Sequence, residues 1–342
     1  MLNYEELNFA YGKPNSTGLI KVFPEDFKVD EILGFELTGE GEHLFLCVEK
    51  RGLNSEAVIK ALASALGKSE KTISYAGLKD RQAITTQWFG VHCPGENLIN
   101  AELLQGEGWR VIEAKRHLKK LKIGALVANE FTLVLRQLTQ KLEIDKRLLQ
   151  IQADGVPNYF GMQRFGHDGQ NLVKAEAMLL GGTKVKNRFL RGLYYSSARS
   201  FLFNQILTER VKEANWCQGL AGDVMQLAGK NSFFSISIAD EIIQERLAKF
   251  DISPAAPLWG KGEERASLDA LTVQEKVLSN YKVWCEALEH HGLERAYRPL
   301  RLHPEQLNWE WPDEQTLKLN FKLEAGSYAT SVVRELITLS DF

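Results

Sequence analysis

The sequence has no long hydrophobic run, and this excludes a protein that spans a membrane by helices. A membrane-spanning helix needs at least about 18 consecutive apolar residues, and no such run occurs in the 342 residues. The first residues, Met1 to Glu6, lack the basic start and apolar stretch of a secretory signal. We therefore expect a cytoplasmic protein with no membrane partner.

Cysteine is scarce, which limits the use of metals and disulfides. The four cysteines, Cys47, Cys93, Cys217 and Cys285, stand far apart in the sequence and form no C-x-x-C pair. Structural zinc sites and disulfide frameworks show closer and more regular spacing. We therefore expect four buried thiols and no bound metal.

Motifs that hold common cofactors are also missing. The chain has neither a G-x-x-x-x-G-K-[ST] loop nor a G-x-G-x-x-G turn, which argues against an enzyme that depends on a nucleotide cofactor. It has no H-x-E with a P-C-x-x-C partner, which argues against a zinc-dependent base deaminase. The chemistry expected below accordingly uses no cofactor.

Net charge is low, but basic residues are concentrated in two stretches. A formal charge of −2 argues weakly against a nucleic-acid partner, because such proteins are commonly basic. Residues 110–122, however, hold six Lys or Arg against one Glu, and residues 184–199 mix five Lys or Arg with Phe189, Tyr194 and Tyr195. Phosphates require cations, and unpaired bases stack on flat rings. Both stretches fit RNA binding, although each is also consistent with a solvated face.

Residue periodicity changes along the chain and indicates two domains, for which 342 residues give room. Up to about residue 140 short apolar or alternating runs predict strands, among them one over 18–29, with one helix at 55–66. Helical spacing then predominates over 141–154, 170–180, 196–213, 240–250 and 272–290, and the alternating run at 317–323 predicts a strand again. Residues 216–238 and 252–265, which contain Gly and Pro, are expected to be irregular. We infer the α+β class, with a mainly helical domain inserted into an α+β domain.

The most informative local motif places Asp80 between Lys79 and Arg81, after Gly77 and before an expected strand at 84–89. Two flanking cations keep a carboxylate ionised near neutral pH. A permanently ionised aspartate can act as a covalent nucleophile. The alternative is a surface turn with local salt bridges.

Four further stretches accompany this motif in a specific order and spacing. They are Lys21-Val-Phe-Pro-Glu-Asp-Phe27-Lys-Val-Asp-Glu31, Asn129-Glu-Phe131, Val156-Pro-Asn-Tyr-Phe-Gly-Met-Gln-Arg164-Phe-Gly166 and Ala325-Gly-Ser-Tyr328-Ala-Thr-Ser-Val-Val-Arg334. With Ala76 to Trp88, they make the chain resemble the tRNA pseudouridine synthase D (TruD) family, bacterial type, from about residue 18 to the end. A single G-x-K-D match would mean little, but agreement of all five stretches is specific.

The resemblance implies an isomerase that converts uridine to pseudouridine in tRNA, at position 13 in the bacterial members. It also implies a pseudouridine-synthase-like catalytic domain with a mixed or antiparallel sheet, formed by residues 1–153 and 305–342. A family-specific, mainly helical α/β domain would be inserted at 154–304. No cofactor or metal is implied, tRNA is the partner, and we expect a monomer.

The resemblance also carries site residues onto this chain. Asp80 takes the place of the catalytic nucleophile. The substrate-binding positions are Phe27, Asn129, Tyr328, Phe131, Lys21, Lys79 and Arg164. At Tyr328 the bacterial pattern more often has Phe, so the ring is kept and a hydroxyl is added.

The chemistry independently calls for such residues. A uridine that leaves its stack needs an aromatic face and a side-chain amide that reads the uracil edge, which Phe27 or Tyr328 and Asn129 can supply. Taken singly, Phe27 and Phe131 are equally typical of a core, Asn129 of a turn, and Arg164 of a salt bridge.

Two other functions are compatible with the residues. A non-catalytic RNA-binding protein would use the same basic and aromatic groups without chemistry at Asp80. A hydrolase would pair Asp80 with a carboxylic acid of raised pKa roughly 5–10 Å away, and Glu25, Asp26 and Glu31 are the candidates.

Overall fold

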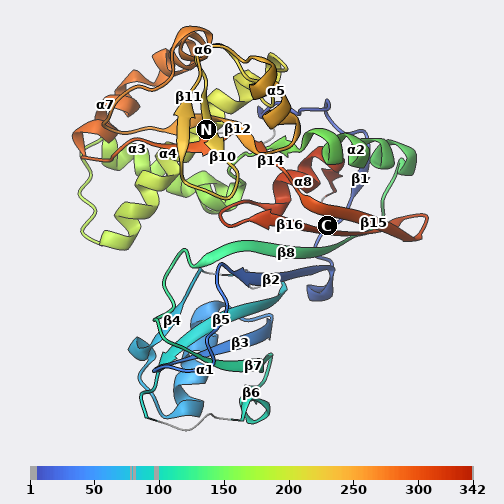
Figure 1. Ribbon diagram of the computed structural model, residues 1–342, viewed down its shortest axis with the longest axis vertical. Helices are drawn as coiled ribbons and strands as arrows, with labels where there is room; N and C mark the ends of the chain where they lie inside the picture. The colour runs from blue at the N-terminus through green and yellow to red at the C-terminus, as the bar shows by residue number, and fades with distance from the viewer. Residues whose placement is uncertain (1–5, 78, 80–81, 96–99, 341–342) are drawn as a thin grey trace. The chain divides into compact units, whose positions relative to one another are not determined.

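The computed structural model describes residues 6–77, 79, 82–95 and 100–340, and the chain separates into two compact units (Figure 1). The sheet unit consists of residues 16–141, 304–326 and 339–342, and the helical unit of residues 1–15, 142–303 and 327–338. The polypeptide therefore passes repeatedly between the units. Assignment of the catalytic domain to 1–153 and 305–342, with an insertion at 154–304, stays a prediction.

The sheet unit is built on one large mixed sheet, which has nine strands among the described residues. Its strand order is β15-β16-β8-β2-β5-β3-β7-β6, with β4 paired to β5. Only β2 and β5 run parallel within this part of the structure; the other pairs are antiparallel. The strands are β2 Phe27–Leu33, β3 His43–Arg51, β4 Ile73–Tyr75, β5 Ile84–His92, β6 Gln105–Gly106, β7 Trp109–His117, β8 Leu126–Leu135, β15 Glu305–Asp313 and β16 Thr316–Glu324.

Helix α1 (Ser55–Leu66) covers one face of this sheet (Figure 1). Successive strand residues point to opposite faces, so alternate residues of β3 pack with the helix, among them Leu44 and Leu46. The intervening Phe45 packs on the other face with Trp88. The helix begins where the Asn54 side chain accepts from the Ala57 amide and ends at Gly67 in a left-handed conformation, as the sequence predicts.

The helical unit combines a small antiparallel sheet, ordered β11-β10-β12-β13, with most of the helices (Figure 1). Its core centres on α4, whose Leu202, Phe203 and Leu207 are fully buried. The helices are α2 Lys141–Asp154, α3 Gln170–Leu179, α4 Arg188–Lys212, α5 Glu241–Ala248, α6 Leu268–Leu278, α7 Lys282–His290 and α8 Ala329–Leu336. The strands are β9 Val156–Pro157, β10 Val224–Leu227, β11 Phe233–Ser235, β12 Ile252–Leu258, β13 Ala296–Pro299 and β14 Arg301–Leu302.

The remaining elements are short. They are β1 Thr17–Gly18, β17 Thr338–Leu339, and the 3-10 turns η2 Pro24–Asp26, η3 Glu70–Thr72, η4 Ala101–Leu103, η5 Met162–Phe165, η6 His167–Gly169 and η7 Ser279–Tyr281.

Several element boundaries differ from the sequence expectation. Helix α4 begins at Arg188, not residue 196, because the Asn187 side chain caps it through the Leu190 amide. The stretch expected as a helix over 272–290 is interrupted by η7, and the segments expected to be irregular contain strands β10, β11 and β12. These strands have only three to seven residues, and runs of that length carry too little periodicity to be recognised in the sequence.

The cysteines are free thiols, and three of the four are buried; Cys217 is half-buried. Burial raises the pKa of Cys47 and of Cys285 to about 12, so neither is a reactive thiolate at neutral pH. Over the described ranges no group of His, Cys, Asp and Glu is placed to hold a metal ion. In those same ranges, every helix is too short or too polar to cross a bilayer.

Candidate active site

Two neighbouring strands place several of the expected site residues side by side in the sheet unit. In β2 the buried residues alternate with exposed ones, so Phe27, Val29 and Glu31 share one face. In the antiparallel ladder with β8, Glu31 pairs with Asn129 and Val29 pairs with Phe131. The spacing of Phe27 and Glu31 in one stretch, and of Asn129 and Phe131 in another, therefore produces a single cluster of side chains.

Lys79 joins the polar members of this cluster. Its ammonium Nζ lies 2.5 Å from Asn129 Oδ1 and 3.2 Å from Glu31 Oε1. The Lys79 side chain is 12% exposed and that of Glu31 is fully buried. A cation thus bridges an amide and a carboxylate in a mostly desolvated position, where such interactions are stronger than in water.

Burial dominates the electrostatics of Glu31. It raises the pKa of the carboxyl, and the Lys79 ammonium, the hydrogen bond from the Trp88 amide and the Lys50 ammonium oppose this. The Trp88 amide donates to Oε2 at 2.8 Å. Two cations and one backbone donor therefore stabilise a carboxylate that burial disfavours.

The segment that leads to Asp80 is fastened by two buried polar residues. Gln87 Nε2 donates to the Gly77 carbonyl at 2.5 Å, and Ser55 Oγ donates to Gln87 Oε1 at 2.8 Å. The Lys79 amide in turn donates to Ser55 Oγ at 3.2 Å. Helix α1 and strand β5 thereby hold the chain at residues 77 and 79. Asp80 and Arg81 lie outside the described residues.

The expected aromatic residues are buried. Phe27 and Phe131 are 4% and 6% exposed, and their rings meet edge to face with centroids 6.2 Å apart. The Lys21 ammonium lies 4.2 Å from the centre of the Phe27 ring, and Lys21 itself adopts a left-handed conformation with φ 59°. The structure therefore brings Lys21, Phe27 and Phe131 together.

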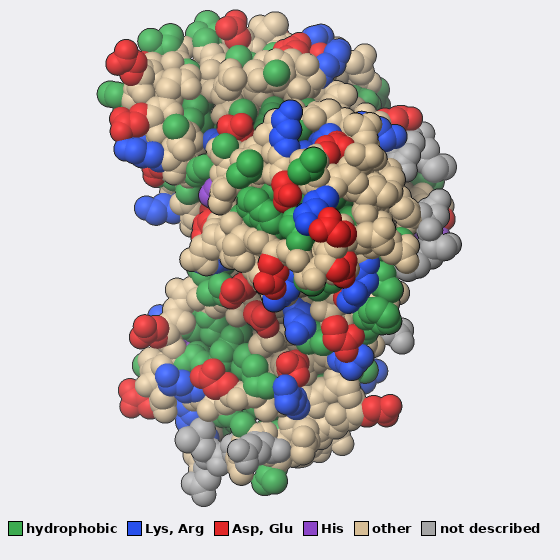
Figure 2. Space-filling view, turned by 90° about the vertical axis from the view of Figure 1, so that its right-hand side faces the viewer, with side chains coloured by type: hydrophobic (Ala, Val, Ile, Leu, Met, Phe, Trp, Pro, Cys, Tyr) green, Lys and Arg blue, Asp and Glu red, His purple; other side chains and the backbone are tan. Residues whose placement is uncertain are grey.

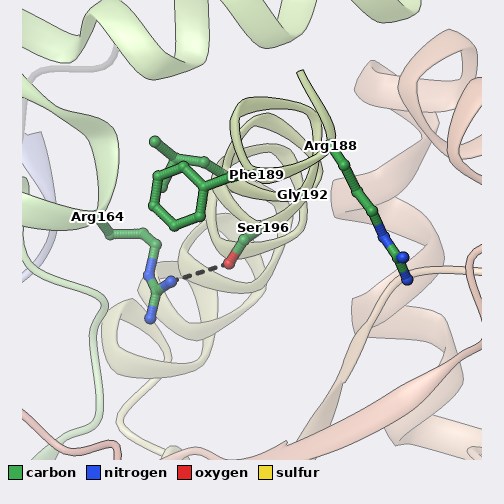
Figure 3. A pocket seen from close by; sticks show the side chains of 6 residues that line it. Arg164, Arg188, Phe189, Gly192 and Ser196 are labelled. Atoms are coloured by element: carbon green, nitrogen blue, oxygen red, sulfur yellow. Dashed lines mark hydrogen bonds between the residues drawn. The ribbon is translucent and has the colours of Figure 1, made fainter. Parts of the chain in front are cut away.

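The two remaining expected residues meet within the helical unit. Arg164, in η5, donates from Nη2 to the Tyr328 hydroxyl at 2.8 Å. Its Nη1 donates to Ser196 Oγ at 3.0 Å (Figure 3). The Tyr328 ring packs edge to face against Phe160. The hydroxyl by which this chain departs from the usual phenylalanine is thus engaged in positioning Arg164.

The basic stretches divide into structural and exposed cations. Arg199 donates to the carbonyls of Leu258 and Glu294, and burial lowers its pKa. Arg116 donates to the carbonyls of Gly41 and Cys93. These two arginines hold the fold together and are not placed to meet phosphates. Arg110 is exposed and forms an ion pair with Glu49. The other exposed cations of the two stretches are Lys115, Lys119, Lys120, Lys122, Lys184, Lys186, Arg188 and Arg191.

Two of the carboxylates considered as the acid of a hydrolase form ion pairs with arginines. Asp26 is buried and forms a bidentate ion pair with Arg136, in which Nη2 donates to Oδ1 at 2.7 Å and Nε donates to Oδ2 at 2.9 Å. Glu25 forms a surface ion pair with Arg51. Burial raises the pKa of Glu31, but one of its oxygens accepts from the Trp88 amide and the other faces Lys79.

Sequence reasoning did not identify Gln87 and Ser55 as supports of the site. Gln87 is fully buried although it is polar. Its position in Ile84-Thr-Thr-Gln-Trp-Phe, among residues of strand character, is the only signal the sequence offers. From the sequence, Glu31 is predicted only as a candidate acid. Its even spacing from Phe27 already indicated that the two side chains share one face of a strand, which is the buried face.

Comparison with protein families identifies one match. The model of the family described as tRNA pseudouridine synthase D (TruD) matches residues 4–184 and 170–336. These two ranges contain all five stretches that carry the resemblance.

Curated relatives match over almost the whole chain. A tRNA pseudouridine synthase D of Legionella pneumophila (strain Lens) is 48% identical over 96% of this chain and 97% of its own length. That of Hydrogenovibrio crunogenus is 44% identical over 96% and 95%. That of Proteus mirabilis is 42% identical over 100% and 98%.

A solved structure shares the fold. The crystal structure of a candidate tRNA pseudouridine synthase D from Methanosarcina mazei superimposes with a TM-score of 0.75, covering 96% of this chain and 95% of that one. The two sequences are 21% identical. This likeness supports the α+β fold with its large mixed sheet.

Proposed function

The chain belongs to the tRNA pseudouridine synthase D family, and from this premise we propose that it isomerises the uridine at position 13 of tRNA to pseudouridine. It is a tRNA-modifying enzyme of the isomerase class. The single observation that carries the proposal is the match of the family model over residues 4–184 and 170–336. Membership in this family favours an enzyme over a non-catalytic RNA-binding protein and over a hydrolase.

The bonds that break and form in this reaction determine which groups the site must supply. The glycosidic bond from uracil N1 to the ribose breaks, the ring turns, and the ribose rejoins C5, which loses its proton while N1 gains one. Reactants and products are isomers, so the reaction needs neither an oxidant nor a group donor. We propose Asp80 as the nucleophile that holds one fragment during the exchange, and we propose that no cofactor takes part.

The Lys79 contact orients Asn129 toward the base. Because Asn129 Oδ1 accepts from the Lys79 ammonium, the amide nitrogen is left to donate. We propose that this NH2 group donates to a uracil carbonyl, which requires the amide to be held in one of its two orientations. Glu31 supports this arrangement by holding the Lys79 ammonium from its other side.

The aromatic and basic residues have separate roles in this proposal. Phe27 and Phe131 form the apolar side of the uridine site, and Lys21 lies against the Phe27 ring. Tyr328 and Arg164 bind the RNA from the helical unit. The exposed lysines of residues 115–122 meet tRNA phosphates.

The proposal extends to assembly and location. We propose that the enzyme acts as a monomer in the cytoplasm, with tRNA as its partner, and that residues 1–153 and 305–342 form its catalytic domain. Size-exclusion chromatography with light scattering tests the monomer directly. A stable dimer at micromolar concentration would contradict it.

The decisive experiment uses unmodified tRNA transcripts labelled with tritium at C5 of uridine. Pseudouridine formation exchanges that hydrogen with water, so the label is released, and mapping of the product locates the modified nucleotide. We expect release by the parent protein, confined to position 13. Tight binding without release from any tRNA would overturn the proposal in favour of an RNA-binding protein.

A further inference from the structure

The helical unit carries an open hollow at the N-terminal end of helix α4. Its volume is about 650 Å³, and it is lined by Arg164, Arg188, Phe189, Gly192, Leu193 and Ser196 (Figure 3). Pockets that bind small ligands span roughly 300–1,000 Å³. The hollow is therefore large enough for a single nucleotide.

Phe189 presents an aromatic ring to this hollow. The residue is 70% exposed, and Figure 3 shows its ring on the same side of α4 as the Arg164 side chain. Single exposed apolar residues are common and by themselves indicate nothing. An exposed ring beside a guanidinium plane, however, provides two of the surfaces on which unpaired bases stack.

Arg164 is a cation whose charge is not compensated nearby. Within the described part of the chain, no carboxylate forms an ion pair with it; its two bonded nitrogens face the hydroxyls of Ser196 and Tyr328. Its Nε is buried and has no hydrogen-bond partner among the described residues. A half-buried guanidinium in this condition is suited to a phosphate oxygen.

The surrounding sequence has only one sign of charge. Residues 183–208 contain five Lys or Arg and no Asp or Glu, and Lys184, Lys186, Arg188 and Arg191 are exposed. Figure 2 shows basic and acidic side chains interspersed over the face that it draws. In Figure 3 Arg188 extends away from Phe189, so its guanidinium is placed to meet the phosphate of a neighbouring nucleotide.

Gly192 keeps the floor of the hollow open. It lies within helix α4, where glycine is less favourable than alanine. A Cβ atom at this position would meet no other heavy atom within 4 Å, so close packing does not require glycine here. What its missing side chain provides is space in the hollow.

We propose that this hollow is a second nucleotide subsite, which takes one unpaired nucleotide of the tRNA in addition to the uridine that reacts. The base stacks on Phe189 above Gly192, and its phosphate binds Arg164. Because Arg164 also donates to Tyr328, occupation of the subsite is coupled to the position of that ring. This inference rests on the proposed function, since it takes tRNA to be the substrate.

The first test compares Phe189→Ala and Phe189→Trp with the parent protein in equilibrium binding of unmodified tRNA and in tritium release. Loss of one stacked base lowers affinity by about 5- to 100-fold, so we expect Phe189→Ala to raise Kd and KM by that factor, and Phe189→Trp to restore both. Ile242→Ala is the matched control, because Ile242 is 67% exposed on α5 in the same unit. It should leave Kd and KM unchanged.

The second test separates stacking from charge. Arg188→Gln should reduce the slope of log K against log salt by about 1, as for one phosphate contact, whereas Phe189→Ala should weaken binding equally at every salt concentration. Gly192→Ala should also weaken binding while the unfolding temperature stays equal to that of the parent or rises. The charge control is Lys230→Gln, in the turn between β10 and β11, which should leave the slope unchanged.

The outcomes distinguish this inference from the proposed function. If the parent forms pseudouridine and both Phe189→Ala and Gly192→Ala bind tRNA like the parent, the hollow is not a nucleotide subsite. If the parent binds tRNA without releasing label but Phe189→Ala still weakens binding, the subsite stands and the proposed reaction fails.

Discussion

Glu31 and Asn129 are cross-strand partners in the β2–β8 ladder, and the ammonium of Lys79 lies within 3.2 Å of a side-chain oxygen of each. An ammonium has three N–H donors and a positive charge, so it can donate to the amide carbonyl and neutralise the carboxylate at once. The arrangement fixes which end of the Asn129 amide remains available. Glu31 and Asn129 stand on strands, where a site is held more precisely than on loops.

Removal of the Lys79 charge should therefore affect both activity and stability. In Lys79→Met, Glu31 is left buried without its main cation, and we expect the free energy of unfolding to fall by about 2 kcal/mol. Misplacement of Asn129 should lower kcat/KM about 100-fold. Chemical denaturation and tritium release measure the two effects.

The double variant Lys79→Met/Glu31→Gln separates the effect on stability from the effect on activity. A neutral amide at position 31 removes the buried charge, so stability should largely recover while kcat/KM stays low. Recovery of activity together with stability would show that Lys79 serves the fold alone.

Substitution of Asp80 by Asn should abolish the reaction and spare binding. The amide keeps the size of the carboxylate but is not a nucleophile. We expect no measurable tritium release and a Kd for tRNA within about threefold of the parent value, because replacement of a carboxylate by an amide removes no phosphate contact. Turnover at the parent rate would exclude Asp80 from the mechanism.

The Tyr328 hydroxyl should matter less than the Tyr328 ring. Tyr328→Phe removes one hydrogen bond from Arg164 at a cost of about 1 kcal/mol, and the stacking surface remains. We predict a KM for tRNA within a few-fold of the parent, whereas Tyr328→Ala should lose at least tenfold in kcat/KM. Equal losses in the two variants would assign the main role to the hydroxyl.

Salt should weaken tRNA binding steeply. Phosphate contacts release counterions, so we expect at least a tenfold rise in Kd between 50 and 200 mM salt. Lys120→Gln, which removes one exposed cation, should reduce the slope of log K by about 1. A Kd that does not change over this range of salt would contradict a binding surface made of these cations.

Stability should fall as pH rises through the range in which Glu335 ionises. Burial raises the pKa of this carboxyl to about 7, against the opposing Arg334 charge, while in the unfolded chain it titrates near 4.5. The folded state therefore binds the Glu335 proton more tightly than the unfolded chain does. The stability gained from this protonation is complete below pH 4.5 and is lost as pH rises through 7. The shift of the Glu335 pKa from 4.5 to about 7 corresponds to about 3 kcal/mol in the free energy of unfolding.

Glu335→Gln isolates this contribution. Glu335 Oε2 accepts from the Ala10 amide, a role the Gln carbonyl can take over. The free energy of unfolding of the parent minus that of the variant should decrease between pH 4 and pH 8. A difference that stays constant over this range would show that Glu335 does not titrate there.

Local signals predicted some elements well. Helix α1 has its cap at Asn54, an apolar stripe and a terminating Gly67, and α2 has clear helical spacing, so both lie where the sequence places them. A strand over 18–29, in contrast, was wrong: Pro24 has a fixed φ and no N–H to donate, and a 3-10 turn at Pro24–Asp26 precedes β2. A single proline can therefore end a strand inside an alternating run, and the periodicity of that run does not show where the strand begins.

The family, the reaction and the expected site residues follow from the amino-acid sequence alone, because five stretches in fixed order specify a chemistry without any knowledge of distances. Which charges are available depends on how the chain is folded. Arg199 looked like a phosphate contact in a basic stretch, and its bonds to two carbonyls make it a structural residue. Glu31 and Lys79 lie 48 positions apart in sequence, and strand pairing and burial make them partners in one site. Charge and residue type are properties of the chain, whereas desolvation and orientation arise only when the chain is packed.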